Sequence, residues 1–323
     1  PALDEIFHEF LPEVPAVELC EKKSIRQTVF QRVTFRRAGK LSWDELAEQL
    51  NFHKQVLCIV NSRKSAQKVY ERLNQDGSFH LSTLMYPDHR RRVLAEIRRR
   101  LTNGLPCRVI STSLIEAGVD VDFPAVFREE AGLDSILQAA GRCNREGNRP
   151  PEESIVTIFQ GPDPPPPLFD IPIAAGRQAL DQFESPDDPE AIRLYFHELL
   201  HLKGTGAQDQ KKILSMIREE RMPFKSVSDR FHLIDSETQT VYIPQNEGKD
   251  LVERLYAGEW DHTLFRSLGQ YAVSIYPQHF EALLAAGDLE LLKDKSAVLI
   301  NMKLYSPDTG LSLEADFGKD LYI

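Results

Sequence analysis

Short apolar runs alternate regularly with amphipathic segments between residues 29 and 160, and this alternation sets narrow limits on the fold. The continuous apolar run Gln55–Val60 is typical of a buried strand, and Ser65–Asn74 places its apolar residues on one face of a helix. Strands separated by helices of this length form right-handed βαβ units, and such units build a parallel sheet. We therefore expect an α/β domain in which helices flank a parallel sheet.

The same patterns predict the remaining elements of this domain. Ser42 and Glu45 have the spacing of a capping box, which indicates that a helix begins there. Further strands are expected at Val29–Phe35, Leu81–Met85, Arg108–Thr112, Ala125–Glu129 and Ser154–Gln160. Further helices are expected at Ser42–Leu50, Arg90–Leu101 and Ser135–Cys143.

The composition changes at Gly161–Pro167, which ends in four consecutive prolines and is typical of a stiff linker. We therefore divide the chain into a connector (1–28), the α/β domain (29–160), a Pro-rich linker (161–173) and a smaller accessory domain (174–323). The accessory domain is expected to be mostly helical or α+β, with helices at Ala174–Phe183, Pro189–Leu202 and Gln208–Arg221 and strands at Phe231–Ile234, Thr240–Ile243 and Ala297–Asn301. Residues 1–28 lack clear periodicity and an initiator Met, so we interpret them as a connector from an upstream domain.

Cysteine spacing and hydropathy exclude several classes of protein. No apolar stretch approaches the ~18 residues of a membrane span, and the N-terminus has no signal-peptide pattern, so no membrane partner is expected. The four cysteines are isolated from one another, which favours neither a zinc site nor a disulfide framework: Cys20, Cys58, Cys107 and Cys143. A reducing cytoplasmic location is the simplest expectation.

One short metal-site pattern is present, His197-Glu-Leu-Leu-His201, which matches the H-E-x-x-H of zinc proteases. Its neighbours are the Leu, Tyr and Phe residues of an amphipathic packing helix, and no further metal-ligating residues accompany it. We therefore predict no metal site.

Positive charge is concentrated in one segment of an otherwise acidic chain. The net charge of the whole chain is −10, yet seven arginines and a single acid, Glu96, lie between Arg90 and Arg108. This segment, which includes Arg91, could contact a phosphate backbone, or it could be a solvated helix face. Charge alone does not decide between these alternatives.

The most specific chemical pattern is Q-x-x-G-R-x-x-R, formed by Gln138, Gly141, Arg142 and Arg145. In a helix, these offsets place all four residues on one face. Two guanidinium groups one turn apart suit the charge that develops on a transferred phosphoryl group, and such arginine fingers act across a domain cleft.

A second pattern lies upstream, where the strand ending at Ser111 and Thr112 is followed by Gly118 and Asp120. Hydroxyl groups and free amides at the carboxyl end of a strand are suitable ligands for a phosphate backbone. Gly118 allows a main-chain amide to approach a nucleotide closely, and Asp120 can accept a hydrogen bond from a ribose hydroxyl.

Together these segments resemble motifs IV, V and VI of superfamily 2 helicases, in the expected order: Asn61-Ser-Arg63, Ser111–Asp120 and Gln138–Arg145. The residue sequence of several segments also resembles the CRISPR-associated helicase–nuclease of type I interference systems: Tyr86–Leu101, Glu116–Asp122, Val126–Glu129 and Leu133–Gln138. Two later segments resemble the C-terminal accessory domain of that family, Phe224–Asp235 and Leu268–Ile275.

The resemblance implies that residues 29–160 form the second RecA-like lobe of an ATP-driven single-stranded-DNA translocase. It implies catalytic arginine fingers at Arg142 and Arg145, and nucleotide contacts that also involve Gly118, Asp120 and Gln138. We expect DNA contacts from Asn61, Ser62, Arg63, Arg90, Arg91, Ser111 and Thr112. The implied partners are single-stranded DNA, an N-terminal lobe with a His-Asp (HD) nuclease and an RNA-guided surveillance complex. An inhibitor protein is a further partner if the chain is a docking module.

The sequence contains neither G-x-x-x-x-G-K-[ST] nor a D-E-x-H box. ATP hydrolysis needs the phosphate cradle and Mg²⁺ that these motifs supply. We therefore expect ATP and Mg²⁺ to be bound mainly by another lobe, with none held tightly by this chain, and we expect the chain alone to be inactive. Two alternatives are a non-catalytic binding module that docks on a separate lobe, surveillance complex or inhibitor, and a truncated superfamily 2 RNA helicase.

Overall fold

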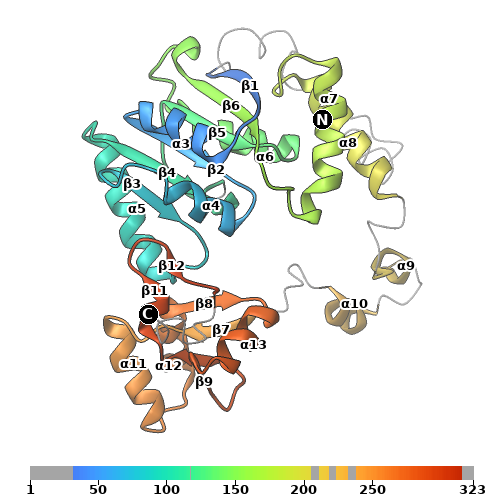
Figure 1. Cartoon of the computed structure of the whole chain (residues 1–323). Helices are drawn as coiled ribbons and strands as arrows, with labels where there is room; N and C mark the ends of the chain where they lie inside the picture. The colour runs from blue at the N-terminus through green and yellow to red at the C-terminus, as the bar shows by residue number, and fades with distance from the viewer. Residues whose placement is uncertain (1–31, 117, 205–210, 218–222, 232–237, 315–323) are drawn as a thin grey trace.

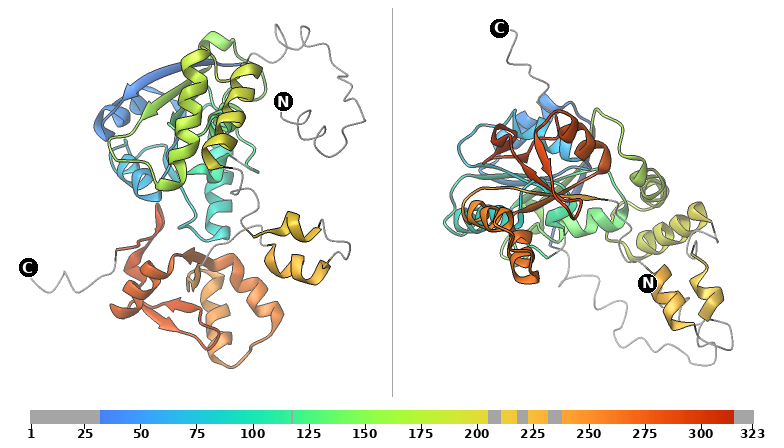
Figure 2. Two further views of the ribbon diagram at one scale, coloured as in Figure 1. Left: turned by 90° about the vertical axis from the view of Figure 1, so that its right-hand side faces the viewer. Right: turned by 90° about the horizontal axis from the view of Figure 1, so that it is seen from below.

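The computed structural model describes residues 32–116, 118–204, 211–217, 223–231 and 238–314. Figure 1 shows an α/β lobe above a smaller α+β domain, with the long helix α5 extending from the lobe toward the smaller domain. Figure 2 shows the same two bodies from the side and from below, with α9 and α10 to one side of both.

The lobe is built on a six-stranded sheet with the order β1-β6-β5-β2-β4-β3, and every pairing in it is parallel. The expected α/β fold with a parallel sheet and flanking helices is confirmed. The strands are β1 (Thr34–Lys40), β2 (Gln55–Ile59), β3 (Ser78–Leu81), β4 (Cys107–Ser111), β5 (Ala125–Glu129) and β6 (Ile155–Gln160). The helices between these strands are α3 (Trp43–Phe52), α4 (Arg63–Tyr70), α5 (Pro87–Thr102), η1 (Ser113–Ile115), α6 (Leu133–Ala140) and η2 (Pro151–Glu153).

Apolar side chains cover both faces of this sheet. Leu57 and Ile59 of β2 pack into one core cluster, and Val56 and Cys58 pack into another on the opposite face. Such two-sided burial explains why β2 appears in the sequence as a continuous apolar run. The capping box at the start of α3 is confirmed, since the Ser42 hydroxyl accepts from the Glu45 amide and the Glu45 carboxylate accepts from the Ser42 amide.

Several of the expected boundaries are wrong. Strand β3 ends at Leu81, where a strand was expected to begin, because Leu84 and Tyr86 pack against the smaller domain. Helix α6 ends at Ala140, because the chain turns at Gly141. The first strand begins and ends five residues later than expected, and residues 29–31 of the expected strand lie outside the described residues.

The helices after the Pro-rich segment pack on the lobe, although the sequence analysis assigned them to the accessory domain. They are η3 (Pro167–Phe169), α7 (Asp170–Gln182) and α8 (Pro189–Lys203). Ala175 and Ala179 of α7 and Tyr195 of α8 form a core cluster with Leu133 of α6. The small alanine side chains let the helices approach closely, which explains why this pair extends the lobe.

The smaller domain contains a four-stranded sheet with the order β8-β7-β10-β9 and a two-stranded sheet of β11 and β12. Its elements and the preceding short helices are α9 (Ile213–Ile217), α10 (Phe224–Arg230), β7 (Gln239–Tyr242), α11 (Glu247–Tyr256), α12 (His262–Leu268), η5 (Gly269–Tyr271), β8 (Ala272–Ile275), α13 (Pro277–Ala285), β9 (Leu289–Leu291), β10 (Ala297–Leu299), η6 (Met302–Leu304), β11 (Tyr305–Ser306) and β12 (Gly310–Leu311). The expected strands at Thr240–Ile243 and Ala297–Asn301 correspond to β7 and β10. The expected strand Phe231–Ile234 and parts of the expected helix Gln208–Arg221 lie outside the described residues.

An aromatic cluster joins the lobe to the smaller domain. The ring of Tyr86, at the start of α5, stacks on Tyr305 with centroids 5.2 Å apart and also contacts Tyr271. The amide of Leu311 donates to the carbonyl oxygen of Leu84 at 2.9 Å. These contacts fix the position of the smaller domain at the N-terminal end of α5.

Candidate functional site

Three predicted polar segments come together at the carboxyl-terminal ends of the central strands of the sheet. Asn61–Arg63 follows β2, Thr112 follows β4, and α6 follows β5. Strand β2 pairs with both β4 and β5, and Ile59 lies opposite Ser111 and Arg128. Because the carboxyl ends of parallel strands coincide, these segments come together at the edge where α/β proteins bind ligands.

Arg142 lies within the protein and holds a neighbouring turn. Its guanidinium donates from Nε to the carbonyl oxygen of Ile115 at 3.0 Å and from Nη2 to that of Glu116 at 2.5 Å. The residue is only 8% exposed. The expectation that Gln138, Arg142 and Arg145 share a helical face is wrong, because α6 ends at Ala140.

Arg145 lies on the loop after α6 and faces solvent. Its Nε is 2.9 Å from an oxygen of Asp120, and these side chains are 40% and 76% exposed. The amide of Arg145 donates to Asp122 at 2.7 Å, and Asp122 also forms an ion pair with Arg149. The loop is therefore fixed at its main chain, while the Arg145 guanidinium stays accessible.

The other predicted nucleotide-binding residues are also on the surface. Gly118 has a φ of +73°, and a Cβ there would meet no atom within 4 Å, so its main chain faces open space. Gln138 is exposed on α6. The described residues thus offer a carboxylate, an amide and one guanidinium, a set of hydrogen-bond acceptors and donors that fits the polar groups of a nucleotide.

Of the predicted DNA-binding residues in motif IV, Ser62 and Arg63 begin α4. The Ser62 hydroxyl accepts from the Ser65 amide as the helix N-cap. The guanidinium carbon of Arg63 lies 5.3 Å from the ring centroid of Tyr276 in the smaller domain, and its Nη1 is buried without a hydrogen-bond partner among the described residues. Arg63 therefore bridges the two bodies of the chain.

Ser111 does not present its side chain to solvent. It is fully buried, and its hydroxyl lies 3.0 Å from the carbonyl oxygens of both Leu81 and Thr112. This placement is incompatible with the expected contact between the Ser111 side chain and bound single-stranded DNA. Thr112, the next residue, is partly exposed.

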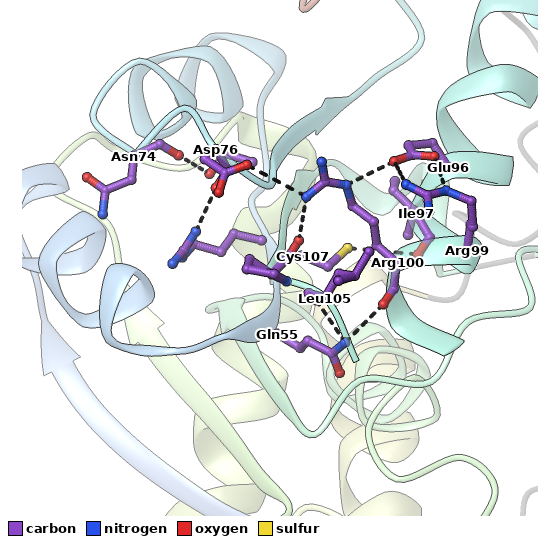
Figure 3. Close-up of polar contacts among 12 residues, drawn as sticks. Gln55, Asn74, Asp76, Glu96, Ile97, Arg99, Arg100, Leu105 and Cys107 are labelled. Carbon is purple, nitrogen blue, oxygen red and sulfur yellow. Dashed lines mark hydrogen bonds and ion pairs between the residues drawn. The ribbon is translucent and has the colours of Figure 1, made fainter. Parts of the chain in front are cut away.

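Helix α5 carries most of the arginine cluster, and intramolecular acceptors bind most of its charge. Figure 3 shows Glu96 accepting from both Arg99 and Arg100. Arg100 also donates to the Pro106 carbonyl oxygen at 3.0 Å. These hydrogen bonds lower the pKa of Glu96 to about 2, so its carboxylate stays ionised near neutral pH. The C-terminal half of the cluster therefore has the contacts of a structural surface helix.

The N-terminal end of α5 contacts the smaller domain. Arg90 donates to the Met85 carbonyl oxygen, and Arg91 donates to the Gln270 side chain at 2.7 Å and pairs with Asp88. Arg91 remains two-thirds exposed, whereas Arg90 is half-buried.

A buried charge cluster that was not expected from the sequence lies beneath the site. Arg128 of β5 is fully buried and forms an ion pair with Glu116, with 3.0 Å between Nε and Oε1. Burial raises the pKa of Glu116 and that of Glu129, although Arg128 counteracts both shifts. The available signal was the pair of charged residues, Arg128 and Glu129, inside a strand expected to be buried.

His197 and His201 of the H-E-x-x-H pattern are exposed on α8, and His197 contacts Glu198 at 3.3 Å. Within the described ranges, no group of three His, Cys, Asp or Glu residues is arranged to hold a metal ion. A search of the same ranges finds no helix with the length and apolar character needed to cross a membrane.

Part of the chain resembles a known protein family in sequence. Residues 53–148 match the family model described as CRISPR-associated nuclease/helicase Cas3, C-terminal. A relative of that name from Haloferax volcanii is 49% identical over 76 residues, which cover 23% of this chain and 8% of the relative. Another from Methanothermobacter thermautotrophicus is 32% identical over 117 residues, covering 35% and 14%. The chain thus matches only a small part of each curated relative.

Solved structures share the fold. The crystal structure of T. fusca Cas3 superposes with a TM-score of 0.57 at 13% identity, covering 94% of this chain and 44% of that one. A chain of a CRISPR RNA-guided surveillance complex in a pre-nicking state gives a TM-score of 0.54 at 13% identity, covering 87% and 44%. The likeness extends over both bodies of the chain and identifies the lobe as RecA-like.

Proposed function

We propose that the chain supplies the second motor lobe of an ATP-dependent single-stranded-DNA translocase of CRISPR interference, because residues 53–148 match the family model described as CRISPR-associated nuclease/helicase Cas3, C-terminal. The other lobe provides the phosphate cradle and the Mg²⁺ site. This lobe completes the nucleotide site from across the cleft. On this account, the isolated chain does not turn over ATP.

The observation that carries the proposal is the accessible Arg145 guanidinium beside Asp120, at the edge where β2, β4 and β5 end. In the assembled site, Arg145 stabilises the charge that develops on the transferred phosphoryl group. Asp120 and Gln138 accept and donate hydrogen bonds at the nucleotide. Arg142, which holds the carbonyl groups of Ile115 and Glu116, positions the turn that carries Gly118.

The neighbouring segments suit a strand of DNA. Ser62 and Arg63 at the start of α4, together with Thr112, lie near the carboxyl ends of adjacent strands. Amides, hydroxyls and a guanidinium in this arrangement contact phosphates without reading sequence. The Tyr276 ring contacts Arg63, so the smaller domain lies next to this segment and can cover the same DNA strand.

The proposed partners follow from the family and from one neighbour. A chain in a structure of a CRISPR RNA-guided surveillance complex shares this fold, and we propose that such a complex recruits the assembled enzyme. The named relatives are nuclease/helicases, so the first lobe and an HD nuclease are the other expected partners.

DNA-stimulated ATP hydrolysis tests the proposal, measured for the chain alone and after addition of the first lobe of a Cas3-type enzyme. Binding of the chain to labelled single-stranded DNA is measured in parallel. Turnover only in the mixture supports a split motor. Binding of the first lobe without turnover would instead favour a non-catalytic docking module.

A further inference from the structure

A buried ion pair joins two segments of the candidate site. Arg128 is fully buried in β5, and its partner Glu116 follows η1, with its second carboxylate oxygen 3.3 Å from the Ser135 hydroxyl on α6. Nη2 of Arg128 is buried with no hydrogen-bond partner in the described part of the chain. An ion pair removed from water and incompletely hydrogen-bonded contributes little to stability, so its presence calls for another explanation.

The same guanidinium holds the loop after β2. Nη1 of Arg128 donates to Oδ1 of Asn61 at 2.7 Å and to the carbonyl oxygen of Glu129 at 2.8 Å. Asn61 also donates from Nδ2 to the carbonyl oxygen of Glu130 and from its amide to the Glu129 carboxylate, at 2.7 and 2.6 Å. Asn61 is thereby fixed to β5 through three of its polar groups, immediately before the N-cap of α4.

The Glu116 end of the ion pair contacts Arg142, which lies just after α6. The carbonyl oxygen of Glu116 accepts from Arg142, while the Glu116 carboxylate contacts Arg128. A continuous series of polar contacts therefore runs from Arg142 through Glu116 and Arg128 to Asn61. Its two ends lie in the segments proposed above to contact nucleotide and DNA.

We propose that Arg128 is a positioning residue. It fixes the position of the Asn61–Arg63 loop relative to the turn that carries Gly118 and the loop that carries Arg145. This inference rests on the proposed function. Arginine suits the role because its planar guanidinium reaches Glu116 with one nitrogen and Asn61 with another, whereas a lysine ammonium lacks this fork. Such a network limits the relative positions that the two loops adopt.

Two variants test the role of Arg128. The double variant Arg128→Met with Glu116→Gln leaves the net charge of the buried cluster unchanged, because Glu129 stays charged and one cation and one anion are removed together. The single variant Arg128→Lys keeps the charge opposite Glu116 but withdraws the contact with Asn61. The matched control is Arg72→Met with Asp44→Asn, an exposed ion pair with a separation of 2.8 Å on the same lobe.

The readouts are the Kd for a fluorescein-labelled oligo-dT strand of about 30 nucleotides, amide hydrogen exchange at residues 61–63, and the melting temperature. We expect both test variants to raise the Kd about 3- to 30-fold and to speed exchange at these amides, with the melting temperature within about 4 °C of the parent. The control pair leaves all three unchanged.

A Kd and exchange rates within about twofold of the parent in a folded Arg128→Lys protein would overturn the positioning role. If the double variant does not fold, Arg128→Lys decides the question; if neither folds, the contacts serve the fold and the inference fails. Failure of the parent chain to bind the strand, with no turnover after addition of the first lobe, would instead remove the proposed function itself.

Discussion

Nε of Arg145 lies 2.9 Å from a carboxylate oxygen of Asp120, so the proposed arginine finger is held by the residue proposed to contact the nucleotide. Both side chains are accessible, and an exposed pair of this kind is weak enough to exchange partners when a phosphate is presented. The pair therefore orients Arg145 in the absence of nucleotide without blocking its use.

Replacing Arg145 by Ala is expected to lower ATP turnover of the assembled enzyme by about 10³-fold or more, because a finger acts on charge that exists only in the transition state. Arg149→Ala is the matched control, since it removes a cation from the same loop that pairs with Asp122. Steady-state hydrolysis with saturating DNA measures both. Near-normal turnover in Arg145→Ala would remove the finger assignment.

Replacing Arg63 by Ala is expected to weaken binding of single-stranded DNA and to reduce the slope of log K against log salt by about 0.7, the loss of one phosphate contact. Arg72→Ala controls for the loss of a cation, since Arg72 lies just beyond the other end of α4 and pairs with Asp44. A fluorescence anisotropy titration at several salt concentrations measures the slope. An identical slope in both variants would place Arg63 outside the DNA interface.

Replacing Gly310 by Ala is expected to destabilise the junction between the two bodies by more than about 2 kcal/mol. Gly310 has a φ of +81°, and a Cβ there would lie within 2.4 Å of the Leu84 carbonyl oxygen. Gly287→Ala is the control, because Gly287 has a φ of +79° but open space around it, so only backbone strain applies. Denaturant unfolding should show a clearly smaller loss for Gly287→Ala, and equal losses would contradict the close approach seen at Gly310.

His80 makes a testable contribution to the pH dependence of stability. Burial lowers its pKa to about 4, and neither ring nitrogen has a hydrogen-bond partner among the described residues. Because the folded-state pKa is below the unfolded value of about 6.5, this stability is fully present above pH 6.5 and is lost as the pH falls toward 4. The loss is up to about 3 kcal/mol.

His80→Phe keeps the ring that packs against Tyr70 and should flatten the fall in unfolding free energy between pH 6.5 and 4. His201→Gln, an exposed histidine on α8, serves as the control. Unfolding curves at several pH values provide the comparison, and an unchanged slope in His80→Phe would show that this histidine is not buried neutral.

The sheet could be predicted from the sequence because strands β2 to β6 are largely buried and its helices are amphipathic. The position of β3 could not, since Leu84 and Tyr86 are as apolar as strand residues but pack against a domain distant in sequence. The helical face proposed for Arg142 and Arg145 failed for a local reason, the end of α6 before Gly141.

The candidate site was predictable as a set of segments but not as a set of contacts. The inward direction of the Ser111 hydroxyl and of the Arg142 guanidinium depends on carbonyl groups that only the fold brings near. The Arg128–Glu116 ion pair joins residues from different elements, so no spacing rule reveals it.

DNA-stimulated ATP hydrolysis by this chain, alone and mixed with a Cas3-type first lobe, distinguishes a split motor from a lobe that is active by itself. The split-motor proposal predicts no turnover by the chain alone and restored turnover in the mixture, which Arg145→Ala abolishes. Turnover by the isolated chain would contradict it, because the chain would then contain a complete phosphate-binding site of its own.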